Sequence, residues 1–187
     1  MPSNGRRTVL LLAVISVLPV LGAYIAYRVW RPDHQVNYGE LIATQNLPSA
    51  QLTDLAGKTF SSDDLHGKWL LATIQPPACD QGCQRSIYYM RQVRLTQGKN
   101  ATRIERLWLL SGSGAPDPRL LAEHPGLLVA RARDPAWLAS FPAKGERSAH
   151  IYLIDPLGNI VLRYDQDPDP KGMIKDLTRL LSVSRIG

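Results

Sequence analysis

The chain has 187 residues, of which 44% are hydrophobic and 20% are charged, and its formal net charge is +6. This composition is typical of a globular domain with one additional segment, and two cysteines are too few for a small scaffold held by several disulfides. Residues 1–31 contain four arginines and no acids. The remainder has 18 basic and 16 acidic side chains, interspersed with one another, which excludes a nucleic-acid-binding surface.

An apolar segment follows the N-terminus. The run from Thr8 to Trp30, "TVLLLAVISVLPVLGAYIAYRVW", has no charge before Arg28, and a helix of about twenty residues spans roughly 30 Å. Arg6 and Arg7 precede it, which favours a cytoplasmic N-terminus. A cleaved signal peptide is the alternative, but the long run and its interfacial aromatics favour an anchor. We predict a single-pass inner-membrane protein with residues 1–7 in the cytoplasm, an anchor over 8–30 and a periplasmic C-terminal domain.

A polar tether is expected over residues 31–48, with "VNYGELI" as its one candidate for an ordered piece, followed by the domain over 49–187. "DLAGKTF", Asp54 to Phe60, predicts a small hairpin around a turn, and "SSDDL" predicts a capped helical turn. The continuous apolar run Trp69 to Ile74 is typical of a strand buried on both faces.

Both cysteines follow this strand, in "QPPACDQGCQRS". A helix is predicted from about Asp80 to Leu95, because Cys83, Ile87 and Met90 recur at helical spacing. Two prolines exclude helix before Cys79. Cys79 should therefore lie at the helix start, with Cys83 one turn inside it.

Helices and strands continue to alternate to the end of the chain. The predicted elements are strands at 103–111 and 127–132, short helices at 117–124 and 134–141, a strand hairpin at 150–164 and an amphipathic helix from about 169 to 184. This order is that of an α/β thioredoxin-like sandwich with an N-terminal hairpin. In such a sheet the cysteine loop lies at the carboxyl edge, where open α/β sheets place their sites.

The helix start gives Cys79 its expected chemistry. Backbone N–H groups and the helix dipole stabilise a thiolate there, so Cys79 is the candidate nucleophile. Cys83 can resolve a mixed disulfide or complete an intramolecular one. Two thiolates could also bind a soft ion such as Cu(I). An inert local disulfide is the third possibility.

These motifs resemble those of the Sco (SenC) family. The resemblance runs from about Leu52 to Leu181 and rests on the CxxxC motif, "DLAGKTFSSDDLHGKW", "IYLIDPLGNIVLRY" and the N-terminal anchor. It implies a membrane-anchored thioredoxin fold that assists copper delivery to cytochrome c oxidase. It also implies that Cys79 and Cys83 hold copper together with a histidine and undergo thiol–disulfide exchange.

The chain departs from this family at two positions. Sco proteins usually have a proline after the second cysteine, where this chain has Gln84. Arg147 stands where their copper-binding histidine is expected, while His150 lies three residues further on. An arginine disfavours a cation and favours a thiolate, which favours redox chemistry over copper binding. His150 is a further candidate metal ligand, beside Cys79 and Cys83.

Related thioredoxin-like classes fit less well. Peroxidase activity is not expected, because Pro76 stands where a peroxiredoxin has threonine or serine. We predict a membrane-tethered thiol–disulfide factor, a possible oxidoreductase, acting on a cytochrome c oxidase subunit or another assembly factor. The alternatives are a Cu(I) chaperone and a non-catalytic assembly subunit with a structural disulfide.

Overall fold

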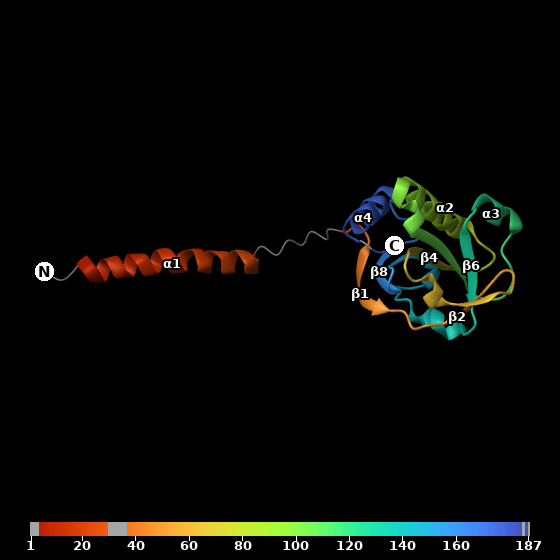
Figure 1. Ribbon diagram of the computed structural model, residues 1–187, viewed down its shortest axis with the longest axis horizontal. Coiled ribbons are helices and arrows are strands. Elements are labelled where there is room, and N and C mark those ends of the chain that lie inside the picture. The colour runs from red at the N-terminus through yellow and green to blue at the C-terminus, as the bar shows by residue number, and fades with distance from the viewer. Residues whose placement is uncertain (1–3, 30–36, 185, 187) are drawn as a thin grey trace. The chain divides into compact units, whose positions relative to one another are not determined.

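The computed structural model describes residues 4–29, 37–184 and 186 (Figure 1). The chain divides into two units, one up to Val36 and the other from Asn37 onward. The first contains helix α1, Asn4–Val29, in which Gly5–Ala26 has a mean hydropathy of 2.6. This helix is long and apolar enough to cross a membrane. Trp30 of the predicted anchor and residues 31–36 of the predicted tether, which include His34, lie outside the described residues.

The second unit is built on a mixed sheet, in which the described residues form eight strands in the order β1-β8-β7-β4-β5-β6-β2-β3. The strands are β1 Glu40–Asn46, β2 Gln51–Asp54, β3 Thr59–Ser61, β4 Trp69–Gln75, β5 Ile104–Leu110, β6 Leu127–Ala132, β7 His150–Ile154 and β8 Asn159–Asp165. β4 and β6 both run parallel to β5, and the other pairs are antiparallel. All seven residues of β4 are buried, as its continuous apolar run predicts.

Helices cover the sheet. The α-helices are α2 Gln81–Thr96, α3 Pro118–Glu123 and α4 Pro170–Val183, and the 3₁₀ helices are η1 Ser62–Leu65, η2 Gly98–Arg103, η3 Pro135–Ser140 and η4 Arg147–Ala149. Figure 1 shows α2, α3 and α4 along one side of the sheet. Met90 and Val93 of α2 and Leu177 of α4 pack there against Leu71 and Leu153. On the opposite face, residues of η3 join a second core. The predicted thioredoxin-like sandwich is thus confirmed.

Most of the predicted elements are present, with small shifts at their ends. The hairpin β2–β3, the capped turn η1 and the hairpin β7–β8 all lie where the sequence indicates. The segment 134–141 contains a 3₁₀ helix at Pro135–Ser140.

The domain begins earlier than the expected boundary at residue 49. Glu40–Asn46, within the expected tether, forms β1 and pairs with β8. Glu40 accepts hydrogen bonds from Lys144 and Arg163, which lower the pKa of its carboxyl group. The sheet edge therefore depends on contacts between residues more than one hundred positions apart.

Candidate functional site

The cysteine loop connects the end of β4 to the start of α2. Asp80 is the N-cap of α2, and its side chain accepts a hydrogen bond from the Cys83 backbone N–H at 2.8 Å. Cys79 immediately precedes this cap and Cys83 lies in the first turn, as predicted. Their Cα atoms are 5.2 Å apart and the two sulfurs form a disulfide.

The two cysteines differ in burial. Cys83 is fully buried in a cluster with Ile87, Trp108 and Val129, while Cys79 is half-buried at the edge of that cluster. An approaching thiol or disulfide therefore reaches Cys79 before Cys83. Cys79 is thus the more accessible of the two sulfurs.

Gln75 fixes the base of the loop. Its carbonyl oxygen accepts hydrogen bonds from the Ser111 N–H at 3.0 Å and from the Trp108 indole N–H at 3.2 Å. Its buried side-chain amide donates to the carbonyl of Ser148 at 2.7 Å and to the hydroxyl of Thr73 at 3.2 Å. One residue thus joins the cysteine loop to β5 and to the turn before β7. Sequence reasoning missed this role, although a polar residue that ends an apolar strand was a signal.

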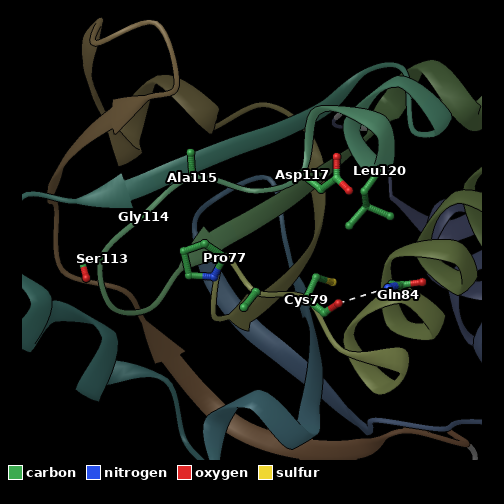
Figure 2. Close-up of a pocket in the computed structure, with 9 residues that line it drawn as sticks. Pro77, Cys79, Gln84, Ser113, Gly114, Ala115, Asp117 and Leu120 are labelled. Atoms are coloured by element: carbon green, nitrogen blue, oxygen red, sulfur yellow. Dashed lines mark hydrogen bonds between the residues drawn. The ribbon is translucent and has the colours of Figure 1, made fainter.

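A pocket of about 630 Å³ lies beside Cys79. Figure 2 shows Pro77 and Cys79 facing the segment that connects β5 to α3. That segment contributes Ser113, Gly114, Ala115 and Asp117, and α3 contributes Leu120. Gln84 also lines the pocket and donates from its side-chain amide to the Cys79 carbonyl at 3.1 Å. The pocket walls were not predicted from the sequence.

His150 lies apart from the cysteines. It begins β7 on the face that also carries Tyr152 and Phe141, whereas Cys83 packs on the face covered by α2. Its ring is buried, with Nε2 at 3.2 Å from the Lys144 carbonyl oxygen and Nδ1 at 3.8 Å from the Asp165 carboxylate. Burial raises the pKa of neighbouring Tyr152 to about 12, so that hydroxyl is neutral at physiological pH.

The Arg147 side chain binds the end of η3 rather than the cysteine sulfurs. Its guanidinium donates to the Phe141 carbonyl at 3.1 Å and to the Ala139 carbonyl at 3.2 Å, where it caps the end of η3. The structure gives it a role in holding the turn before β7. Neither of these two hydrogen bonds brings Arg147 to Cys79, so they do not support a role for Arg147 in stabilising a Cys79 thiolate.

A copper ion would need a third ligand beside the two sulfurs. Within residues 4–29, 37–184 and 186, no three His, Cys, Asp or Glu side chains converge on a common point. His66 is exposed next to Asp63, and His124 is buried near Arg106. The described side chains do not fit a three-ligand copper site in this disulfide-bonded arrangement.

Comparison with known proteins supports the fold. No curated protein matches the sequence. ScoI of Bradyrhizobium japonicum, solved with copper bound, is 24% identical, with a TM-score of 0.56 over 72% of this chain and 99% of its own. Copper-bound yeast Sco1 is 18% identical, with a TM-score of 0.61 over 73% of this chain and 92% of its own.

A thiol–disulfide oxidoreductase domain has nearly the same TM-score to this chain as ScoI. The thioredoxin domain of a thiol-disulfide oxidoreductase from Bacteroides vulgatus is 20% identical, with a TM-score of 0.55 over 75% of this chain and 96% of its own. These likenesses confirm the predicted resemblance to Sco proteins at the level of the fold. Residues 69–184 match the family described as "Transmembrane-like, thioredoxin-like, C-terminal domain". This match covers more than half of the chain, which therefore belongs to that family of thioredoxin-like domains.

Proposed function

We propose that the protein is a membrane-tethered thiol–disulfide oxidoreductase that reduces a disulfide in a partner protein. The observation that carries this proposal is the Cys79–Cys83 pair, in which one sulfur borders a pocket and the other is fully buried at the helix start. An inert structural bridge needs no access, whereas exchange needs one accessible sulfur.

The reaction uses only the two thiols and the partner disulfide. The reduced Cys79 thiolate attacks one sulfur of the partner, and the other partner sulfur leaves as a thiolate. Cys83 loses its proton, attacks Cys79 and releases the second partner thiol. The partner gains two electrons, and Cys79–Cys83 is oxidised to the disulfide. A dithiol reductant in the same compartment then regenerates the reduced pair.

The partner is proposed to be a cytochrome c oxidase subunit or another factor in its assembly. BsSco, a protein of similar fold, has a disulfide switch and belongs to the Sco family of cytochrome c oxidase assembly proteins. The apolar α1 supports a single-pass anchor, and Arg6 and Arg7 support a domain on the periplasmic side. Disulfide chemistry belongs to that compartment.

A trapping experiment with the full-length chain in detergent tests the roles of the two sulfurs. In a Cys83→Ser variant the mixed disulfide between Cys79 and a partner cannot be resolved, so a disulfide-linked adduct should accumulate. A Cys79→Ser variant should form little adduct, since Cys83 is buried. Non-reducing electrophoresis measures the adduct, and a double variant is the control. If the adduct accumulates in Cys79→Ser and not in Cys83→Ser, Cys83 is the attacking sulfur and Cys79 the resolving one.

Oxidase activity of cells that carry each variant tests the partner. Loss of assembly with Cys79→Ser supports an active role of this sulfur, in thiol–disulfide exchange or in copper carriage, which the copper titration below separates. Intact assembly would show a non-catalytic subunit whose disulfide is structural.

Copper carriage is the second candidate. It is supported by the copper bound in the ScoI and Sco1 structures and by two thiols that match the cysteine positions of that family. The chain would carry Cu(I) as cargo on Cys79 and Cys83, and His150 would need a different position to join them. Tight binding of one Cu(I) by the reduced full-length chain, lost in His150→Ala, would favour copper over redox chemistry.

A further inference from the structure

A pocket borders Cys79. One side of the pocket is the cysteine loop. The other side is the 113–120 groove wall, which we define as Ser113, Gly114, Ala115, Asp117 and Leu120. On the β7 side of the loop, the hydrogen bond from the Gln75 amide to the Ser148 carbonyl joins β4 to the turn before β7. A partner segment that reaches the Cys79 sulfur is therefore expected to enter between the cysteine loop and the 113–120 groove wall.

The pocket lining combines apolar side chains with one charged side chain. Pro77, Ala78, Ala115 and Leu120 give it small apolar surfaces, and Asp117 is its only side chain with a formal charge among the nine described residues that line it. Figure 2 shows Asp117 and Leu120 on the same side of the pocket as the Cys79 sulfur. The Asp117 carboxylate is held in place, because one of its oxygens accepts the Arg119 N–H at 2.8 Å.

We propose that this pocket binds an extended segment of the partner in which a basic residue stands next to the reactive cysteine. The inference rests on the proposed function, because it names the class of protein disulfide that the same Cys79 attacks. Because Asp117 is the one formally charged side chain among the nine described lining residues, it attracts a lysine or arginine into the pocket and repels an acid. The apolar surfaces accept the small flanking residues of the segment.

The charge acts on the first exchange step. As the Cys79 thiolate attacks the partner sulfur, the basic side chain lies against Asp117, and the partner thiolate leaves. Asp117 does not touch the reacting sulfurs in this scheme, so it selects the partner rather than performing the exchange. Removing the Asp117 charge should therefore change the preference between basic and acidic partners. If Asp117 were purely structural, its removal would leave that preference unchanged.

Two synthetic peptides test this inference. Both carry one cysteine in a mixed disulfide with thionitrobenzoate, and they differ only in a lysine or a glutamate beside that cysteine. Attack by the reduced full-length chain on the peptide sulfur releases coloured thionitrobenzoate, whose rate of release is measured in a nonionic detergent. We expect the lysine peptide to react about fivefold faster at low salt, with a smaller ratio at high salt.

The chain offers a matched pair of variants. Asp117→Asn keeps an N-cap residue at α3 and removes the charge, so the lysine-to-glutamate rate ratio should fall towards one. Asp169→Asn makes the same change at α4, where Asp169 is likewise an exposed N-cap followed by proline, and should keep the wild-type ratio.

The outcomes separate the inference from the proposed function. Equal rates for the two peptides with the wild-type chain, or the same loss of preference in Asp169→Asn, overturn the docking inference alone. Faster exchange between two copies of the chain than with either peptide also overturns it, because the pocket would then serve a second copy. Failure of the wild-type chain to react with either peptide and with neutral hydroxyethyl disulfide would overturn the proposed function itself.

Discussion

At the scale of single residues, the buried polar groups of the domain differ in whether their hydrogen-bonding atoms have partners. Gln75 has hydrogen-bond partners for both its side-chain amide and its carbonyl oxygen. Arg106 is buried with its Nε and Nη1 atoms unpaired, and the Nδ1 atom of nearby His124 is buried and unpaired as well. Burying polar atoms without hydrogen-bond partners costs free energy in the folded state. A change in the charge of these side chains should therefore change the free energy of unfolding.

His124 should make the folded state sensitive to acid. Burial lowers the pKa of His124, and the charges of Arg106 and Arg91 lower it further, against a small opposing effect of Glu123. The unfolded chain therefore binds a proton more readily than the folded chain. Its contribution to stability is fully present above the ordinary pKa of about 6.5 and is lost as pH falls below it.

Urea denaturation of the full-length chain at about pH 7.5 and about pH 5.5 measures this effect. His124→Gln should reduce the fall in the denaturation midpoint between the two pH values, because glutamine does not titrate there. His66→Gln is the control, since the His66 side chain is 44% exposed. An unchanged pH dependence in His124→Gln would contradict the prediction.

At the scale of elements, α4 fastens the start of the domain. Asp176 of α4 is buried, and its carboxylate accepts the N–H groups of Tyr38 at 2.9 Å and Gly39 at 2.8 Å, together with the Tyr164 hydroxyl at 3.3 Å. Burial raises the pKa of Tyr164, which keeps that hydroxyl a donor. A Cβ atom at Gly39 would lie 2.5 Å from the Tyr164 ring, so only glycine fits there without rearrangement.

Replacing Asp176 should therefore loosen β1. In Asp176→Ala two backbone N–H groups and a hydroxyl lose a charged acceptor, and we expect a loss of about 3 kcal/mol in the free energy of unfolding. Amide hydrogen exchange should rise in Glu40–Asn46 before it rises in β4. Asp167→Ala is the control, because Asp167 is an exposed carboxylate that binds Tyr89 and Arg85 at the surface. Unchanged exchange in β1 would show that Asp176 does not hold it.

At the scale of the whole molecule, local signals in the sequence predicted most of the fold. Helix starts were visible because Asp117, Asp134 and Asp169 each precede a proline and cap the backbone two residues on. The segment of β1 was assigned to the tether, with only "VNYGELI" as an ordered candidate, because its pairing with β8 involves distant partners of Glu40. The cysteine positions followed from the helix start, whereas the pocket and the place of His150 depend on how separate loops pack.

The membrane orientation gives the last prediction. Arg6 and Arg7 favour a cytoplasmic N-terminus, while Arg28 and Arg31 on the other flank oppose that bias. Alkaline phosphatase fused after residue 187 should be active in a bacterial host, because that enzyme needs an oxidising compartment for its disulfides. Replacing Arg6 and Arg7 with asparagine should lower the fused activity, and further replacing Arg28 and Arg31 should restore it by removing the opposing charges. If the first double variant keeps full activity, the arginines on the N-terminal flank do not set the orientation, and the apolar length of α1 alone directs the domain outward.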